Sequence, residues 1–204
     1  AWITDMNQVL GHSAGNALEV QEALAFLDGS AREPRLLEVT RMLSAELLLI
    51  GRLALKHEVA LQRVDAVLAN GRALEHFARM VGVLGGPTDF CERADRHLAM
   101  APVRRDVPAP HSGWVERIDT RGIGLAIIEL GGGRRQASDA IDPRVGFSEF
   151  IALGRRVERG DALAVVHAAS DAAADAACAA LKTLIYIGDA APATTPVLIE
   201  SITG

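Results

Sequence analysis

The sequence predicts an α/β protein: part of an α/β domain, built of core helices and sheet strands, with a small β-rich module inserted near the C-terminus. Three observations predict this class. An extended apolar run opens the chain at residues 1–5, helix-forming segments fill most of residues 16–83, and short β-rich runs separated by glycines begin near Pro108. We expect residues 1–5 to form a buried strand. A last alternating run at residues 196–203 has the period of a strand, and we expect it to join the same sheet.

Four helices are expected in the first half of the chain. Asn16 and Glu19 have the spacing of a capping box, with Asn16 accepting from first-turn amides and Glu19 reaching back, and Gly29 is placed to end that helix. The apolar residues between positions 36 and 56 are so dense that we expect a core helix buried on most sides. Further helices are expected over residues 57–70 and 72–83.

The amino-acid composition of the chain changes near Pro108. We expect short strands there, with turns at Gly131-Gly132-Gly133 and at residues 158–161 that join neighbouring strands as hairpins. The expected strands are residues 114–118, 124–130, 147–152 and 162–167, and an alanine-rich helix follows over residues 171–187. The predicted segments are therefore residues 1–107 as the mostly helical part of the α/β domain, 108–170 as the β-rich module, and 171–204 as the return to the α/β body.

The composition excludes several classes of function. The chain has 204 residues, 50% of them hydrophobic, which is enough for one full core and a second small one. The formal net charge is −5 with acidic and basic residues interspersed, so we expect no nucleic-acid partner. The longest apolar stretch, residues 43–55, contains Glu46 and Arg52, so we expect no membrane span. The distant cysteines Cys91 and Cys178 are typical of reduced thiols in a cytoplasmic protein.

Several runs of residues resemble thymidine and pyrimidine nucleoside phosphorylases, and they extend over essentially the whole chain. The runs are ITDMNQ at residues 3–8, LG at 10–11, GNALEV at 15–20, GPTDF at 86–90, GGGRRQASD at 131–139, ID at 141–142 and VGF at 145–147. Val9 departs from the pattern, because the bacterial enzymes usually carry proline there, and this change affects the stiffness of the loop.

The resemblance implies a small helical domain and a large α/β domain that close on the substrate. It implies reversible phosphorolysis of a pyrimidine nucleoside such as thymidine, with inorganic phosphate as co-substrate, no required organic cofactor, and a homodimer in the full-length protein. In the family, the segment that matches Ala1 follows the phosphate loop and the Arg, Ser and Lys residues that bind the base. We therefore expect a C-terminal portion of such an enzyme, with no catalytic residue of its own and inactive without the missing N-terminal half.

The segment after residues 1–5 holds the candidate site residues, because ligands of open α/β sheets collect at the carboxyl ends of strands. By resemblance, Met6 lines the pyrimidine side of the cleft, although a buried, gap-filling methionine is an equal reading of the residue alone. Family members also hold a monovalent cation, taken to be potassium. The matching ligands are the backbone carbonyls of Leu10 and Ser13 and the side chain of Glu22, oxygen donors that suit a hard cation, and Glu22 as a solvated helix residue is the alternative.

The glycine loop at residues 131–133 allows two interpretations. Its amides and the guanidinium groups of Arg134 and Arg135 have the chemistry of an anion site. The interpretation we favour is a hairpin turn with Arg134 or Arg135 paired to Asp139 or Asp142, because backbone conformation alone then explains the glycines.

A second class of function is a carrier or docking module. Residues 108–168 resemble the barrel-sandwich domains that carry biotin or lipoate. Such carriers need a lysine at a hairpin tip, and residues 108–168 contain none. The alternative to an enzyme portion is therefore a non-catalytic structural or docking module that is neither biotinylated nor lipoylated.

Overall fold

The structure is a computed structural model that describes residues 1–202. The chain divides into two compact units, one made of residues 1–20 together with the chain from residue 98 onward, and the other of residues 21–97. The mixed α/β class expected from the sequence is confirmed. The segment boundaries at residues 107/108 and 170/171 stay a prediction.

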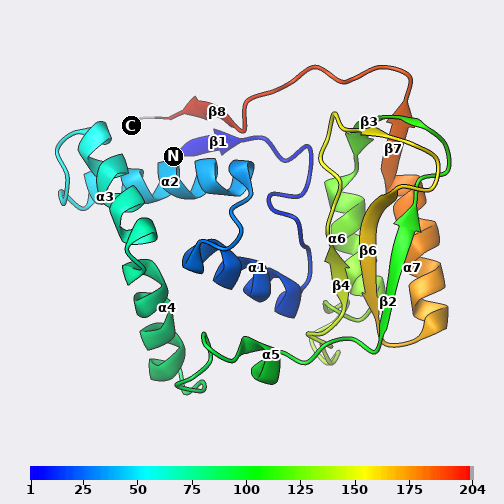
Figure 1. The fold of residues 1–204 in the computed structure, drawn as a ribbon, viewed down its shortest axis with the longest axis horizontal. Coiled ribbons are helices and arrows are strands. Elements are labelled where there is room, and N and C mark those ends of the chain that lie inside the picture. The colour runs from blue at the N-terminus through cyan, green and yellow to red at the C-terminus, as the bar shows by residue number, and fades with distance from the viewer. Residues whose placement is uncertain (203–204) are drawn as a thin grey trace. The chain divides into compact units, whose positions relative to one another are not determined.

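Two three-stranded antiparallel sheets form the centre of the first unit (Figure 1). One has the order β2-β6-β4, and the other has the order β5-β3-β7. The strands are β2 (Val103–Pro108), β3 (Gly113–Ile118), β4 (Gly146–Ser148), β5 (Arg156–Val157), β6 (Ala162–Ala168) and β7 (Ile185–Gly188). Over the described residues the strands close no barrel, and both sheets contribute to one hydrophobic core.

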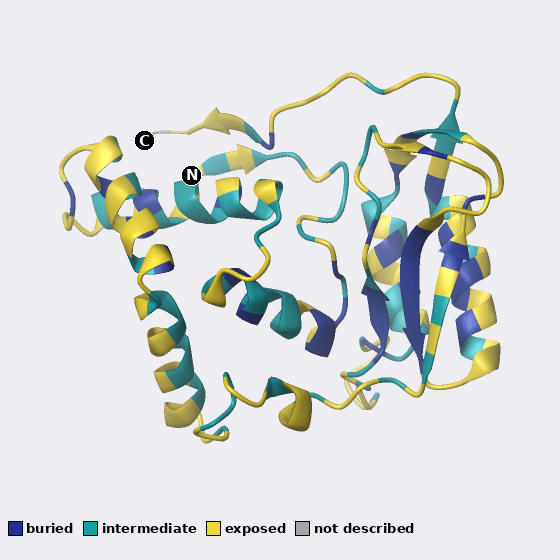
Figure 2. Cartoon of the chain, in the orientation of Figure 1, coloured by how far each residue is buried: buried dark blue, intermediate teal, exposed yellow. Residues whose placement is uncertain are grey.

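Two helices complete this core, α6 (Thr120–Glu129) and α7 (Asp171–Leu184). In α7 the buried residues Ala174, Ala177, Cys178 and Leu181 recur every three or four positions, which gives the helix one apolar face. That face packs against β2 and β6, and the small alanine side chains allow a close approach of helix and sheet. Figure 2 shows β6 as a buried strand at this centre.

The first and last described strands pair with each other, as the sequence predicts. Strand β1 (Trp2–Thr4) runs antiparallel to β8 (Leu198–Ser201) in a two-stranded sheet. The expectation of a buried first strand is wrong, because Ile3 is 42% exposed. The expected last strand also included Thr203, which lies outside the described residues.

Helices make up the second unit. They are α2 (Pro34–Ile50), α3 (His57–Ala69), α4 (Arg72–Val83), the short α5 (Ala94–His97), and the C-terminal part of α1 (Asn16–Asp28), which crosses the boundary between the units. Gly29 follows α1 with φ +84°, in the left-handed conformation expected just past a helix end. The predicted bounds of α3 and α4 agree with the structure to within one residue.

Helix α2 differs from its prediction in two ways. Glu33 caps its start by accepting from the Leu36 amide, and the helix ends at Ile50 because Gly51 and Arg52 (φ 54°) leave the helical conformation, so it does not reach residue 56. It is also not buried on most sides, since Ile50 is 71% exposed and only Val39 and Ala45 are buried. Most of the apolar side chains of α2 are therefore not buried within this chain.

The β-rich part and the helix that follows it contain further corrections. Residues 124–130, expected as a strand, lie largely in helix α6, because Asp119 caps the helix by accepting from the Gly122 amide and Ile123 and Ala126 face the core at helical spacing. Gly131 then follows the helix end rather than a hairpin. The turn at residues 158–161 connects β5 to β6, which belong to different sheets, and the expected helix to residue 187 ends at Leu184, where β7 begins.

Two glycines bring distant backbone segments into direct contact within the first unit. Gly15 and Gly146 have φ of +145° and +150°. A Cβ on Gly15 would lie 2.7 Å from the Val145 carbonyl oxygen, and one on Gly146 would lie 2.4 Å from the Ala14 carbonyl oxygen. Both separations are shorter than a van der Waals contact, so no other residue fits either position without moving backbone.

We expect Gly15→Ala and Gly146→Ala each to lower the free energy of unfolding by at least about 2 kcal/mol, because backbone strain alone costs about 1–3 kcal/mol. Urea denaturation followed by circular dichroism measures this. The control is Gly124→Ala, a helical position where a Cβ meets nothing within 4 Å. There alanine should be neutral or stabilise by up to about 1 kcal/mol. Equal stability of all three variants would contradict the role of the glycine contact.

Candidate functional site

The segment singled out by the sequence, residues 5–15, is held in the first unit by hydrogen bonds along its length. Ala14 and Phe147 exchange two backbone hydrogen bonds of 2.9 and 2.8 Å, as neighbouring antiparallel strands do. The Phe150 amide donates to the His12 carbonyl at 3.1 Å. The Leu153 amide donates to the Gln8 side-chain oxygen at 2.8 Å. The segment therefore behaves as an irregular added strand beside β4 and the loop that follows it.

A compact polar network fixes the beginning of this segment, next to the β1–β8 sheet. The Asp5 amide donates to the Val197 carbonyl at 2.8 Å. The Thr195 hydroxyl donates to Asp5 at 2.6 Å and accepts from the Asn7 side-chain amide at 3.0 Å. The Asn7 backbone amide donates to the Asp5 carboxylate at 2.9 Å, closing a turn around Met6.

Met6 lies at the tip of this turn, with its side chain 75% exposed. The reading of Met6 as a buried, gap-filling methionine is therefore wrong. Its backbone carbonyl accepts a hydrogen bond of 2.7 Å from the hydroxyl of Thr120, the first residue of α6. Sequence reasoning missed Thr120, although Asp119-Thr120 ahead of the apolar run at residues 123–130 has the pattern of a helix start.

The three expected cation ligands lie before and within α1. Ser13 is 9% exposed and Leu10 is 41% exposed, and both belong to the first unit. Glu22 is half-buried on α1 and belongs to the second unit. Within residues 1–202 no three His, Cys, Asp or Glu side chains gather as metal ligands. A cage built mainly from backbone carbonyls is of a different kind, so the cation site stays a prediction.

The capping box predicted at the start of α1 forms in an altered way. The Glu19 carboxylate accepts from the Gly15 amide at 2.9 Å, so it reaches back one residue further than expected. The Asn16 side-chain amide donates to the Gly132 carbonyl at 2.9 Å. Asn16 thus connects α1 to the glycine loop at residues 131–133.

An internal carboxylate occupies the amides that follow this glycine loop. Asp139 accepts from the backbone amides of Arg135 and Gln136 at 2.9 and 3.1 Å, and these bonds lower its pKa. Arg134 donates to the Asp139 carbonyl, and Arg135 pairs with Glu129. The favoured interpretation is only partly correct. The glycines follow the end of α6 and form no hairpin, Arg134 bonds to the backbone carbonyl of Asp139, and Arg135 pairs with Glu129 on α6.

A half-buried serine and a buried histidine form a pair in the β2-β6-β4 sheet. The Ser148 hydroxyl on β4 lies 2.8 Å from Nε2 of His167 on β6, and His167 is 4% exposed. Arg104 lies opposite His167 on β2 and pairs with Glu149. Burial and the positive charge of Arg104 lower the pKa of His167, while Glu149 acts in the opposite direction. No sequence signal marks this pair, because it depends on the register of strands distant in the chain.

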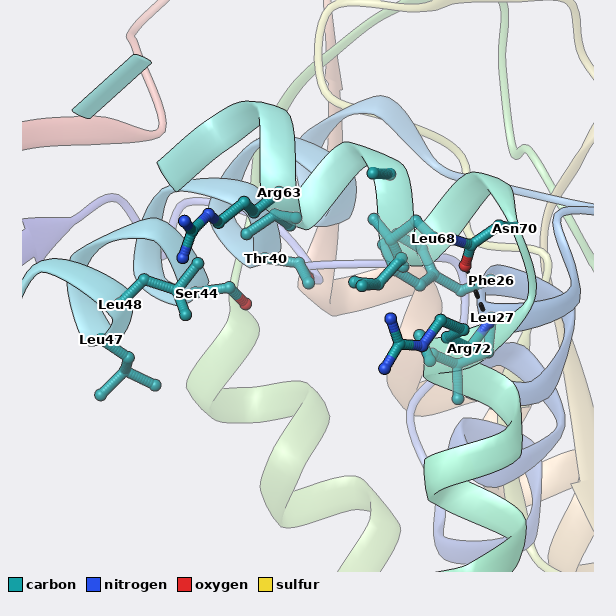
Figure 3. Close-up of a pocket in the computed structure, with 14 residues that line it drawn as sticks. Phe26, Leu27, Thr40, Ser44, Leu47, Leu48, Arg63, Leu68, Asn70 and Arg72 are labelled. Atoms are coloured by element: carbon teal, nitrogen blue, oxygen red, sulfur yellow. Dashed lines mark hydrogen bonds between the residues drawn. The ribbon is translucent and has the colours of Figure 1, made fainter. Parts of the chain in front are cut away.

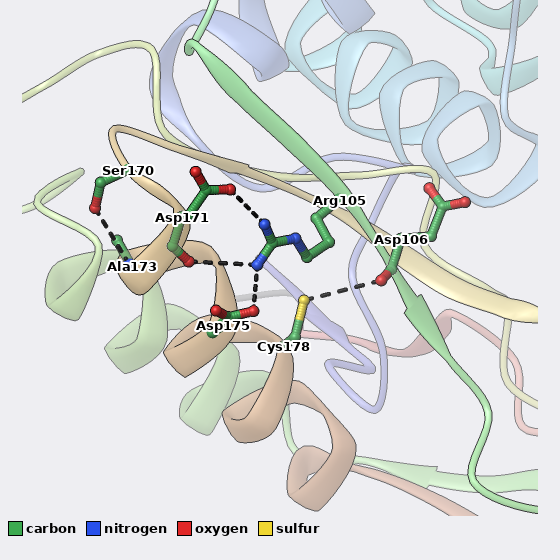
Figure 4. A network of polar contacts seen from close by, with 7 residues as sticks. All are labelled: Arg105, Asp106, Ser170, Asp171, Ala173, Asp175 and Cys178. Atoms are coloured by element: carbon green, nitrogen blue, oxygen red, sulfur yellow. Dashed lines mark hydrogen bonds and ion pairs between the residues drawn. The ribbon is translucent and has the colours of Figure 1, made fainter.

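A second polar cluster ties β2 to α7 (Figure 4). The Arg105 guanidinium pairs with both Asp171 and Asp175, one turn apart on the first turns of α7. Acidic residues there also interact favourably with the helix dipole. Behind this cluster the Cys178 thiol lies 3.9 Å from the Asp106 carbonyl oxygen, and burial raises its pKa. The cluster is thus a structural connection at the edge of the core.

The second unit contains a pocket of about 700 Å³ between its helices (Figure 3). Its lining is mostly apolar, with Arg63 and Arg72 on opposite sides of it in Figure 3. The Arg72 amide donates to the Asn70 side-chain oxygen at 3.1 Å. None of the site residues expected from the sequence lines this pocket, and its lining fits an apolar group better than a phosphate ion.

The fold and the anchored segment together define a mixed α/β domain that holds a loop in a fixed conformation. Residues 114–188 match the family model described as the pyrimidine nucleoside phosphorylase C-terminal domain. Residues 114–188 are therefore similar to the C-terminal domain of that family, and the resemblance of the motifs that lie within this segment is confirmed. The match runs from β3 to β7 and includes both helices of the core. Within residues 1–202, no helix has both the length and the hydropathy needed to cross a membrane.

The buried His167 of this pair predicts a specific dependence of stability on pH. The folded pKa of His167 lies below its unfolded value of about 6.5, so the unfolded chain binds more protons between the two values. The free energy of unfolding should therefore fall as the pH drops from about 6.5 to the folded pKa, and then level off. Urea denaturation at a series of pH values measures it.

His167→Gln should flatten this part of the profile, because glutamine retains hydrogen bonding without titrating. The matched control is His111→Gln, an exposed position in the same unit, which should leave the profile unchanged. A profile equally steep in the wild type and in His167→Gln would assign the acid sensitivity to other groups.

Proposed function

We propose that this chain is the C-terminal portion of a thymidine phosphorylase or a closely similar pyrimidine nucleoside phosphorylase. Such an enzyme transfers the deoxyribosyl group of thymidine to phosphate and yields thymine and 2-deoxyribose 1-phosphate. The observation that carries the proposal is the match of residues 114–188 to the C-terminal domain of this family. The runs at residues 3–8 and 15–20, which resemble the same enzymes, support it on the N-terminal side of the match.

In the proposed reaction a phosphate oxygen forms a bond to C1′ of the nucleoside while the bond from C1′ to the base nitrogen breaks. The sugar passes through an oxocarbenium-like state, and the departing base carries the electron pair and takes up a proton. Fixed donors that stabilise the developing charge usually supply the largest part of such catalysis. We propose that a missing N-terminal half supplies these donors and the phosphate loop.

The contribution proposed for this chain is a wall of the substrate site. Met6 is suited to it, because the polar network around Asp5 and Thr195 fixes its backbone and its thioether side chain remains exposed. An exposed, unbranched and polarizable side chain adapts to the face of a flat ring. We further propose a homodimeric, cytoplasmic enzyme, as the family resemblance implies.

We expect this chain alone to show no measurable phosphorolysis and to regain it when mixed with the N-terminal half. Losing one fixed donor typically lowers the rate by about 100- to 1,000-fold, so losing the phosphate loop and the base-binding residues together abolishes detectable turnover. The assay follows thymine release from thymidine in phosphate buffer, with uridine in parallel to determine the base preference.

Two controls make this assay decisive. The N-terminal half alone should be inactive, and the intact protein should release base at the full rate. Turnover by this chain alone would show that the catalytic residues lie within it, which contradicts the proposal. An intact protein that releases base from neither nucleoside would exclude the proposed reaction and favour the structural or docking module.

We also propose that a potassium ion binds at Leu10, Ser13 and Glu22 in the complete protein. The donor set suits the ion, since two carbonyl oxygens and a carboxylate are hard ligands and Ser13 is largely shielded from water. The bound cation would supply positive charge and order the loop between Met6 and α1. No residue of this set takes part in a bond-making step.

Replacing Glu22 should weaken the stabilisation of the complete protein by potassium. A cation that binds only the folded state contributes about 2.7 kcal/mol at 100 times its dissociation constant, so Glu22→Ala should move the rise in melting temperature to higher potassium concentration. Glu38→Ala, an exposed glutamate on α2, is the matched control. A wild-type melting temperature that stays constant across the titration would rule out the site.

A further inference from the structure

We propose that Thr120 is a positioning residue for the Met6 turn, so that the C-terminal domain fixes the geometry of one wall of the substrate site. This inference rests on the proposed function for its consequence in catalysis. The hydrogen bond itself, from the Thr120 hydroxyl to the Met6 carbonyl at 2.7 Å, belongs to the structure.

The geometry favours Thr120 because the Met6 peptide is held from two sides. On the side of the β1–β8 sheet, Asp5 bonds to the Val197 carbonyl and to Thr195. On the side of the phosphorylase domain, Thr120 supplies the donor to the Met6 carbonyl. Without Thr120 the turn would keep its attachment to the segment just before β8 and lose its direct attachment to α6.

Thr120 is itself rigidly placed. It is the first residue of α6, and the preceding Asp119 caps the helix by accepting from the Gly122 amide at 2.8 Å. Three residues after Thr120, Ile123 is 2% exposed in the core. The start of α6 is therefore fixed by its cap and by the packing of Ile123. The hydrogen bond from Thr120 in turn fixes the Met6 turn relative to the core.

The arrangement combines a fixed backbone with a free side chain at Met6. A methionine that only fills space would be buried, whereas this side chain is 75% exposed while its peptide is hydrogen-bonded. Such a residue can contact a ligand without first paying the entropy of ordering its backbone. Loss of the Thr120 hydroxyl should thus weaken substrate binding while the bond-making step and the fold are retained.

The chain offers a conservative variant and a matched control. Thr120→Val removes the donor at nearly constant shape, and Thr120→Ser keeps it. Thr183→Val is the control, because the Thr183 hydroxyl donates at 2.8 Å to the Ala180 carbonyl within α7, in the same unit and far from the turn in the chain.

Kinetics of the intact protein provide the first readout. Thr120→Val should raise KM for the nucleoside by about three- to tenfold, the range that one ordinary hydrogen bond corresponds to, with kcat and melting temperature close to the wild type. Thr120→Ser should restore KM, and Thr183→Val should leave it unchanged. A KM that does not rise in Thr120→Val, or that rises only together with a lower melting temperature, would overturn the proposal.

Hydrogen exchange provides a second readout that is independent of the reaction. Backbone amides of residues 5–8 should exchange faster in Thr120→Val than in the wild type, Thr120→Ser or Thr183→Val. Equal exchange in all four proteins would overturn the positioning role even if the enzyme is active. If the wild type releases no base, the proposed function fails, and the exchange rates still decide whether Thr120 fixes the turn.

Discussion

The close contact between the backbones of Gly15 and Gly146 is the constraint on which the candidate site depends. It allows Ala14 and Phe147 to pair as neighbouring strands, and this pairing places the whole segment from Met6 to α1 against the two-sheet core. Next to this pairing, His12 bonds to Phe150 and Gln8 bonds to Leu153, both in the loop after β4. A side chain at either glycine would separate the two strands and with them every contact on both sides.

The core behind this contact has a simple physical basis. Alanines on α7 bring the helix close to β2 and β6, and the larger side chains Phe147, Leu163 and Leu181 are fully buried in the same core. Buried polar groups are few, and the His167 imidazole has the Ser148 hydroxyl as its partner. The family match covers this core from residue 114 to residue 188, while the segment that carries Met6 reaches it from elsewhere in the chain. The segment that matches the family thus contacts the Met6 turn, which lies more than 100 residues earlier in the chain.

The sequence predicted those parts of the fold that depend on local signals. The starts and ends of α3 and α4 agree because Asn70-Gly71 and the glycines near residue 85 interrupt a clear helical period. Residues 124–130 are expected as a strand because periodicity cannot tell strand from helix in a short apolar run, and only the Asp119 cap distinguishes them. The exposure of Met6 and the Ser148–His167 pair could not be predicted, since both depend on which distant segments become neighbours. The family motifs located the candidate segment, but its Thr120 contact required the structure.

The pairing of Ala14 with Phe147 also changes how the β2-β6-β4 sheet meets its surroundings. Strand β4 lies at one margin of that sheet, and such a margin normally presents unpaired amide and carbonyl groups to which a strand of another molecule can add. The two hydrogen bonds at Ala14, followed by the His12 bond to Phe150, occupy these groups along β4 and just beyond it. The segment between the Met6 turn and α1 therefore shields the sheet from intermolecular strand addition, so detaching this segment from β4 would expose an edge prone to self-association.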